Sequence, residues 1–237
     1  MRHLSFDRLH NFRDLGGYPG EGGRPVRWGA LYRADSLGKL AGADLSRFTS
    51  LGIRTVVDLR YPWEIDRDGR VPVELDYHNL SVEHRPYDQA ALDASVLPGR
   101  YLADRYLEVV TDGAAELATA LRVIAASPGP TVIHCTSGKD RTGLLAALVL
   151  SLVGVTQSDI VADFALTELA TDRLVADWHD RYGGTLWPGY GRAPAEVMTL
   201  FLTELTDRHG SVPAYVRAIG VSDEVVTALR DRLLSAG

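Results

Sequence analysis

The chain has 237 residues, of which 46% are hydrophobic and 24% are charged, and its formal net charge is -6 at pH 7. This length and composition suit one globular domain with a sizeable core, so we expect a single domain over residues 1–237. The negative charge argues against a general nucleic-acid binder, and a single cysteine excludes an internal disulfide.

The N-terminal residues and the longest apolar runs bear on location. The first residues lack the apolar core of a signal peptide, and no apolar run is long enough for a transmembrane helix. We therefore expect a cytoplasmic protein without integral membrane association. Secretion by a route that needs no signal peptide is the alternative.

The first half of the chain predicts strands and helices in alternation. In chain order, we expect a glycine-rich turn at Gly20–Gly23, a strand over Val26–Tyr32, a helix over Asp44–Ser50, strands over Arg54–Leu59 and Tyr77–Val82, and a loop over 83–98. Arg54–Leu59 alternates into a valine pair, which is typical of a strand, and Pro62 is expected to stop it.

The second half is predicted to be mostly helical around one central strand. We expect helices over Tyr101–Val110 and Ala114–Ala126, a strand over Thr131–His134, a buried helix over Leu144–Val153, a helix from Ser158 towards Asp177, a loop over Thr185–Ala193, and helices over Pro194–Arg208, Val212–Ile219 and Ser222–Leu234. Strands that alternate with helices predict an α/β fold with a mostly parallel central sheet flanked by helices.

The segment between the central strand and the buried helix carries the chemistry. Residues 134–143 read His-Cys-Thr-Ser-Gly-Lys-Asp-Arg-Thr-Gly, and Cys135 is the only cysteine. A tight loop that enters a helix N-terminus directs backbone N–H groups and the helix dipole at one point, which favours an anion there. The sequence therefore predicts a cysteine nucleophile at the base of a phosphate-binding loop.

The residue types in this loop suit attack on phosphorus. A helix N-terminus and a neighbouring guanidinium lower the pKa of a cysteine thiol, and the thiolate is the nucleophilic form. Arg141 offers a planar fork for two phosphate oxygens, and Asp140 is placed to protonate the leaving oxygen. Thr142 can donate its hydroxyl to the thiolate, and Lys139 adds positive charge. The residues expected to bind substrate are Thr136, Ser137, Gly138, Lys139 and Thr142.

Other interpretations of the loop are weaker. A nucleotide-binding P-loop needs a glycine where Ile133 stands. One cysteine and seven scattered histidines give no zinc-ligand pair, so we expect neither a metal nor a cofactor. Cys135 could also be an ordinary buried hydrophobic residue, but this would not explain why Gly138 and Arg141 follow it at these spacings.

The loop resembles a known signature. His134-Cys135, five residues and then Arg141-Thr142 resemble the motif of cysteine-dependent protein tyrosine phosphatases. With Gly138-Lys139-Asp140 inside it, the loop is similar to that of the bacterial tyrosine-specific and atypical lipid phosphatases, the PtpB-like group. Further segments resemble this group in the same order, so that the resemblance covers the chain from His3 to Leu234: Asn11–Tyr18, Leu31–Asp35, Val57–Arg60 and His209–Val212.

The resemblance implies a fold and a mechanism. It implies a protein tyrosine phosphatase-like fold and metal-independent hydrolysis through a phosphocysteine on Cys135, with Arg141 binding the transferring phosphoryl group. Because Trp187-Pro188-Gly189 lacks the carboxylate of the familiar Trp-Pro-Asp acid, the resemblance gives the role of acid to Asp140. Asp58 is the reserve candidate. His134 is implied to support the loop, with direct proton transfer as the alternative.

The other implied features each have a structural alternative. The resemblance implies a lid within residues 164–193, with an ordinary amphipathic core helix as the alternative, and C-terminal helices over 194–237. Asp58 and Arg60 form either part of the site or a plain ion pair at the end of a strand. Arg13 lies in a glycine-rich turn beside Asp14, where a structural salt bridge is expected more than a catalytic role.

The expected partner is a phosphorylated substrate. Phosphotyrosine in a protein is the first candidate, and a phosphoinositide or a small nucleoside or sugar phosphate is the alternative. Lys139 beside Asp140 resembles loops that accept phosphoinositides, whereas Thr136 in place of a basic residue weakens that interpretation. A non-catalytic phosphate-binding module is disfavoured because Cys135, Asp140 and Arg141 occur together.

Overall fold

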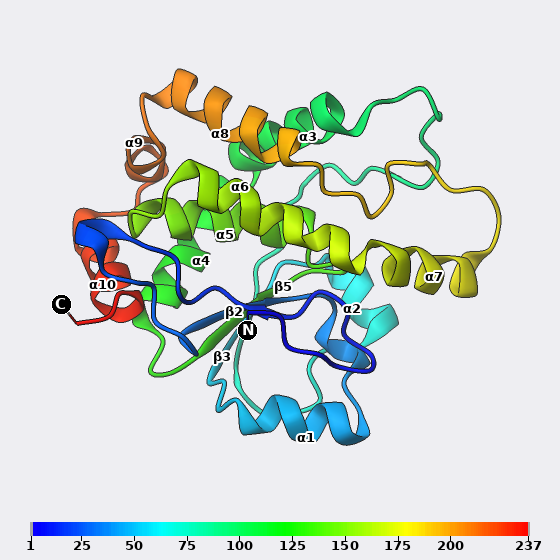
Figure 1. Ribbon diagram of the computed structural model, residues 1–237, viewed down its shortest axis with the longest axis horizontal. Helices are drawn as coiled ribbons and strands as arrows, with labels where there is room; N and C mark the ends of the chain where they lie inside the picture. The colour runs from blue at the N-terminus through cyan, green and yellow to red at the C-terminus, as the bar shows by residue number, and fades with distance from the viewer. Residues whose placement is uncertain (1, 237) are drawn as a thin grey trace.

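The computed structural model describes residues 2–236, which form a five-stranded sheet between helices (Figure 1). The strands are β1 (Arg13–Asp14), β2 (Leu31–Ala34), β3 (Thr55–Asp58), β4 (Asp76–Asn79) and β5 (Thr131–His134). Their order is β1-β2-β5-β3-β4, and all neighbours are parallel except β1, which pairs antiparallel with β2. The predicted α/β class with a mostly parallel sheet is confirmed.

The helices account for most of the remaining chain. They are α1 (Gly42–Ser50), α2 (Pro62–Asp68), α3 (Pro98–Asp112), α4 (Ala114–Ala126), α5 (Asp140–Leu152), α6 (Gln157–Ala165), α7 (Thr171–Tyr182), α8 (Ala195–His209), α9 (Val212–Ala218) and α10 (Asp223–Leu233), with short 3-10 turns η1 (Glu21–Gly23), η2 (Leu37–Lys39) and η3 (Leu166–Ala170). Among residues 2–236, no helix is both long and apolar enough to cross a membrane.

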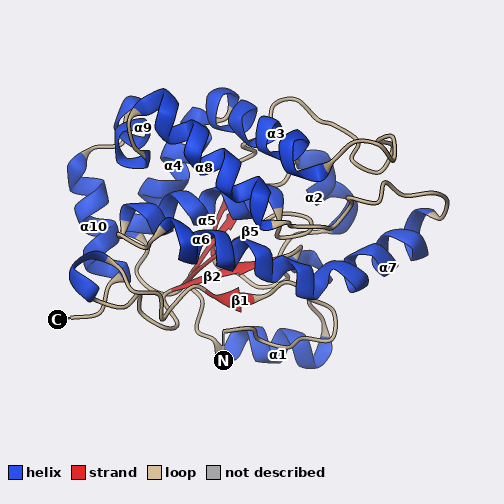
Figure 2. Cartoon of the chain, turned by 45° about the horizontal axis from the view of Figure 1, so that its top comes forward, coloured by secondary structure: helices blue, strands red, loops and turns tan. Residues whose placement is uncertain are grey.

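The sheet separates two hydrophobic cores of unequal size. Successive residues of a strand point to opposite faces, so Ile133 of β5 joins the large core and Val132 the small one. The large core holds α3–α6 and α8–α10, and the small core holds α1 and the N-terminal segment (Figure 2). Helix α5 is buried along almost its whole length because it lies between the sheet and other helices.

The structure differs from the prediction at the start of β2 and directly after β3. The strand expected over Val26–Tyr32 is wrong in its first part: β2 starts at Leu31, because Gly29 has a positive φ of 74° that turns the chain there. Val26 makes only an isolated bridge with Leu234. Pro62 does follow β3, but it also begins α2, which was not predicted. Proline suits the first turn of a helix because its missing N–H needs no partner there.

The helix predicted from Ser158 towards Asp177 is divided. The structure has α6, then the 3-10 turn η3, then α7, and Thr156 caps α6 by accepting from the N–H of Asp159. This division matters because α6 stays in the core, whereas α7 runs out along the edge of the molecule (Figure 1). By contrast, the predicted helix over Ala114–Ala126 and the strand over Thr131–His134 are confirmed at both ends.

Candidate active site

The loop predicted to bind phosphate connects β5 to α5. The chain leaves the central strand at His134, turns through residues 135–139 and enters α5 at Asp140. Gly138 has a φ of 66°, and a Cβ there would lie 2.5 Å from the carbonyl oxygen of Ala34. Only glycine satisfies both the backbone angle and this contact, so the loop packs closely onto the end of β2.

Cys135 lies under this loop. Its side chain is 1% exposed, and it is a free cysteine among the described residues. The next residue, Thr136, lines a cleft of about 880 Å³ together with Ser137, Lys139, Asp140 and Arg141. The loop therefore faces a large cavity at the carboxyl ends of the parallel strands, where open α/β sheets bind ligands.

Arg141 is held in place from outside the loop. Its Nη1 and Nη2 lie 2.6 and 3.0 Å from the two carboxylate oxygens of Glu64, a bidentate pair. The hydroxyl of Thr136 donates to the same carboxylate. Burial opposes the charge of Glu64, but Arg141 outweighs it and holds the pKa of this carboxyl below its usual range. The guanidinium is therefore oriented before any substrate arrives.

Glu64 was not predicted from the sequence, although a local signal exists. Its Oε2 also accepts the N–H of Tyr61 at 2.8 Å, which closes a capping box at the start of α2. Pro62 followed by a glutamate at the third helical position is a recognised helix start. That pattern predicts α2, but not its contact with an arginine 77 residues further along.

Glu83 is a second carboxyl at this arginine that the sequence did not reveal. It is 8% exposed, lines the cleft, and its Oε2 lies 3.6 Å from Nε of Arg141. Burial raises the pKa of Glu83, and Arg141 offsets this only in part. Glu83 is therefore a buried group that holds a proton more readily than a free glutamate.

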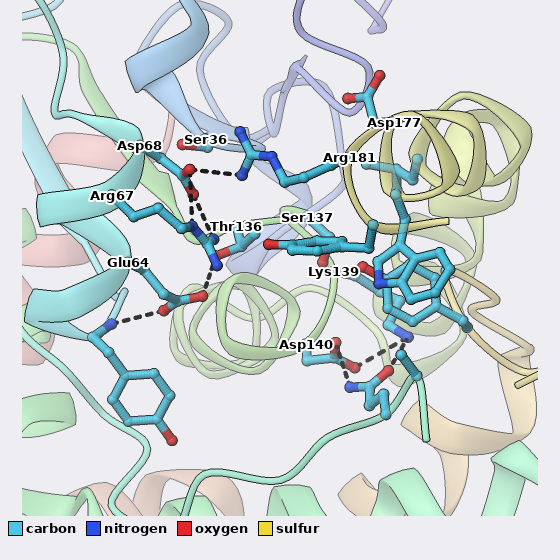
Figure 3. Close-up of a pocket in the computed structure, with 18 of the residues that line it drawn as sticks. Ser36, Glu64, Arg67, Asp68, Thr136, Ser137, Lys139, Asp140, Asp177 and Arg181 are labelled. Atoms are coloured by element: carbon cyan, nitrogen blue, oxygen red, sulfur yellow. Dashed lines mark hydrogen bonds and ion pairs between the residues drawn. The ribbon is translucent and has the colours of Figure 1, made fainter. Parts of the chain in front are cut away.

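Asp140 lines the cleft apart from Glu64 (Figure 3). Its Oδ1 accepts from the Tyr106 hydroxyl at 2.8 Å, and its Oδ2 accepts from Nε2 of Gln89 at 3.2 Å. Nζ of Lys139 lies 3.5 Å from the same carboxylate and 3.4 Å from Oε1 of Gln89. The lysine side chain is therefore engaged beside Asp140, and both residues line the cleft.

The other residues predicted in the loop differ in their access to the cleft. Ser137 lines the cleft, while Gly138 lies against β2. The hydroxyl of Thr142 is buried and has no hydrogen-bond partner within residues 2–236, so its donation to the thiolate stays a prediction. His134 is fully buried, and its Nδ1 lies 3.3 Å from the carbonyl oxygen of Cys135. This position suits support of the loop.

Asp58 and Arg60 form a buried ion pair at the end of β3. Nη2 of Arg60 lies 2.6 Å from Oδ2 of Asp58, and both side chains are fully buried. Burial opposes ionisation of Asp58, but His134 and Arg60 outweigh it and hold its pKa well below the usual range. The structure thus places Asp58 and Arg60 behind the loop and outside the lining of the cleft.

Arg13 also lies behind the loop, in an ion pair with Asp163 of α6. Nε of Arg13 is 3.2 Å from Oδ1 of Asp163, and both side chains are buried. Oδ2 of the same carboxylate lies 2.8 Å from Nη1 of Arg33. Burial opposes the charge of Asp163, but the two arginines lower its pKa to about 2. The expected structural salt bridge of Arg13 is present, with Asp163 as its partner.

Helix α7 forms one wall of the same cleft. Leu174, Asp177, Trp178 and Arg181 line it, and Nη1 of Arg181 reaches Oδ1 of Asp68 in α2 at 2.7 Å (Figure 3). Asp177 accepts from Nζ of Lys39 at 2.7 Å. The segment predicted as a lid therefore borders the loop, and its opening and closing stay a prediction.

The comparisons with known proteins agree with this geometry. A family described as the tyrosine phosphatase family matches residues 4–235. The chain belongs to the tyrosine phosphatase family. It is accordingly a phosphoric monoester hydrolase, as the resemblance predicted.

Three curated proteins are similar to this phosphatase along most of its length. A Cupriavidus necator protein described as a candidate tyrosine-protein phosphatase is 36% identical over 98% of this chain and 85% of its own. A tyrosine-protein phosphatase of Nostoc commune is 29% identical over 88% of this chain and 75% of its own. The triple specificity protein phosphatase PtpB of Mycobacterium tuberculosis is 28% identical over 94% of this chain and 96% of its own.

Proposed function

We propose that this phosphatase hydrolyses phosphotyrosine through a phosphocysteine on Cys135. The observation that supports this is the burial of the only cysteine beside a loop that lines one cleft together with the oriented Arg141. Preorganised donors around a transferring phosphoryl group stabilise the transition state without reorganisation. No cofactor takes part in this proposal.

The first step transfers the phosphoryl group to sulfur. The Cys135 thiolate attacks phosphorus, an S–P bond forms and the bond from phosphorus to the leaving oxygen breaks. Arg141 and the loop N–H groups bind the three equatorial oxygens. Asp140, which lines the cleft, gives its proton to the leaving oxygen.

The second step releases inorganic phosphate. Water attacks phosphorus, the S–P bond breaks and sulfur leaves as the thiolate. The Asp140 carboxylate takes the proton of the water, which restores the acid for the next cycle. The Tyr106 and Gln89 hydrogen bonds keep this carboxyl in one position in both steps.

The lining of the cleft supports an aromatic leaving group. Six aromatic side chains line it: Tyr61, Trp63, Tyr87, Trp178, Tyr182 and Tyr190. Tyr61 and Trp63 are stacked at 15°, with ring centroids 5.6 Å apart. Aromatic walls favour a flat apolar group such as the phenyl ring of phosphotyrosine.

A second class of substrate is supported by the size of the cleft. A cavity of about 880 Å³ is large for one phosphotyrosine side chain and accommodates a bulkier phosphate ester, such as a phosphoinositide or a nucleoside or sugar phosphate. The charges of the cleft argue against a lipid with several phosphates, because seven carboxyl side chains and only five cationic ones line it. Phosphotyrosine therefore remains the first candidate substrate.

A panel of substrates tests the proposal. We expect kcat/KM to be highest for phosphotyrosine peptides, lower for small sugar or nucleoside monophosphates, and lowest for phosphoinositides with several phosphates. Cys135→Ser should abolish turnover of all of them while still binding phosphate. Retention of activity in the Cys135→Ser protein within about tenfold of the wild type would rule out the cysteine mechanism.

A further inference from the structure

The carbonyl groups of the loop are bound from outside, one after another. The carbonyl oxygen of Thr136 accepts from the N–H of Ser36 at 3.1 Å, and that of Ser137 accepts from Nδ2 of Asn11 at 3.0 Å. The carbonyl oxygen of Gly138 accepts from Nη2 of Arg33 at 2.7 Å. Three consecutive peptide units are thus fixed by groups that do not belong to the loop.

Holding the carbonyls outward determines where the N–H groups point. A trans peptide is planar, so its C=O and the N–H of the following residue point in opposite directions. Among the described residues, the N–H groups of Ser137, Gly138 and Lys139 donate to no backbone carbonyl. They are therefore turned away from Asn11 and Arg33 and are free to bind an anion.

Asn11 and Arg33 belong to one buried network. Nη1 of Arg13 donates to Oδ1 of Asn11, while Nε of Arg13 and Nη1 of Arg33 share the Asp163 carboxylate. The N–H of Asn11 is in turn held by Oδ1 of Asp35 at 3.1 Å. All five side chains are at most 1% exposed. Within residues 2–236, Nε of Arg33 is the one side-chain nitrogen of this network without a hydrogen-bond partner, so the remaining contacts are the ones that fix its geometry.

We infer that Arg33 and Asn11 are positioning residues that aim the loop N–H groups at the transferring phosphoryl group. This inference rests on the proposed function, because it assigns a task to the same loop. It predicts that losing the contact of Arg33 with the Gly138 carbonyl weakens binding of the transition state more than binding of the substrate. Arg13 contacts no loop carbonyl and reaches the loop only through Asn11, so Arg13→Lys is a comparison in which the direct contact of Arg33 with the loop is kept.

The test compares Arg33→Lys with Arg13→Lys. Both variants keep a positive charge and lose a guanidinium contact with Asp163, but only Arg33→Lys loses the link to the Gly138 carbonyl. For each folded variant, kcat and KM are measured with p-nitrophenyl phosphate. Binding of tungstate, a phosphate-like oxyanion, is measured by calorimetry, which needs no turnover.

We expect Arg33→Lys to lower kcat and tungstate affinity by about 100-fold, as for loss of oxyanion donors, with a much smaller change in KM. Arg13→Lys should stay within about tenfold of the wild type in both. Equal losses in the two variants, or a folded Arg33→Lys protein with near wild-type kcat and tungstate affinity, would overturn the inference.

Two further results keep the test decisive. If Arg33→Lys does not fold, Asn11→Ala takes its place, because it removes the donor to the Ser137 carbonyl. Its kcat and tungstate affinity should then show the losses expected for Arg33→Lys. If the wild type binds tungstate but hydrolyses no phosphate ester, the proposed function fails. The positioning role is then decided by the tungstate measurements alone.

Discussion

At the scale of single residues, Arg141 is the group whose geometry is most demanding. Lysine keeps the charge but cannot bind two oxygens of phosphate and the Glu64 carboxylate with a planar fork. Arg141→Lys should therefore lower kcat by at least about two orders of magnitude, or about 3 kcal/mol of transition-state stabilisation. Steady-state kinetics checks this, with Arg181→Lys on the far wall of the cleft as the control.

Asp140 is tested through its dependence on the leaving group. A poor leaving group needs a proton in the transition state, whereas an activated phenol does not. Asp140→Asn should thus depress kcat more for phosphotyrosine than for p-nitrophenyl phosphate, and should flatten the basic limb of the pH–rate profile. The buried Asp58→Asn variant serves as comparison. If Asp140→Asn slows both substrates equally and leaves the profile unchanged, Asp140 is a binding residue.

Glu83 predicts a pH-dependent effect on stability. Because burial raises its pKa, the folded protein binds this proton more tightly than the unfolded chain does. The stability that Glu83 contributes is therefore present at low pH and is lost as pH rises through the raised pKa. Glutamine cannot ionise, so Glu83→Gln should gain in Tm relative to the wild type between about pH 4 and about pH 8.

The control for Glu83 is an exposed glutamate. Glu74 lies on the surface, and Glu74→Gln should show the same difference in Tm from the wild type at both pH values. A Glu83→Gln protein whose difference in Tm stays constant, or falls with pH, would contradict the direction of the pKa shift.

At the scale of elements, α7 is fastened to the opposite wall mainly by charges. Only Thr171 and Leu174 of this helix are buried, so few apolar contacts hold it. Its polar links to other segments are Arg181 to Asp68, and Asp177 to Lys39 and His10. Arg173 also donates to the carbonyl oxygens of Phe6 and Asp7. Exposed ion pairs contribute at most about 1 kcal/mol each, which permits opening.

The combined variant Arg181→Met with Asp177→Asn should therefore speed amide hydrogen exchange in α7 and leave α5 unchanged. Arg217→Met, which removes an exposed ion pair with Asp223, is the matched control and should leave α7 exchange unaltered. Unchanged α7 exchange in the combined variant would favour the alternative of an ordinary packed helix over a lid.

Elements were predictable where the pattern is local. Ala114–Ala126 shows apolar spacing of a helix over its whole length, and the structure has the same bounds. The predicted start of β2 was wrong because a positive φ at Gly29 leaves no trace in hydrophobic periodicity. The long helix from Ser158 divides into α6, η3 and α7 through tertiary packing, which periodicity does not record.

The site, too, was predictable only where its residues lie close together in the sequence. The loop residues follow from one contiguous motif. Glu64 and Glu83 contact Arg141 from distant parts of the chain, and Asp163 holds Arg33, which in turn contacts the loop. Which charged residues pair over such long distances in the sequence depends on the topology of the sheet. Sequence spacing therefore predicted Cys135 and Arg141 as the reacting pair, and the structure shows the carboxylates that hold Arg141.

At the scale of the whole molecule, the fold gathers scattered segments at one end of the sheet. The segments around Asn11, Arg33 and Asp58 lie beside the loop because β1, β2, β5 and β3 are neighbours in the sheet. Helix α6 adds Asp163 from the large core. The loop over residues 135–139 is thus surrounded by residues from both halves of the chain.

The most direct test of the account is to trap the intermediate. Wild-type protein is mixed with excess p-nitrophenyl phosphate, quenched in acid within the first turnovers, and digested for peptide mass spectrometry. The account predicts one phosphoryl group on the peptide that contains Cys135, and none in the Cys135→Ser protein. Turnover with no phosphoryl group on Cys135, or with one on another residue, would contradict it.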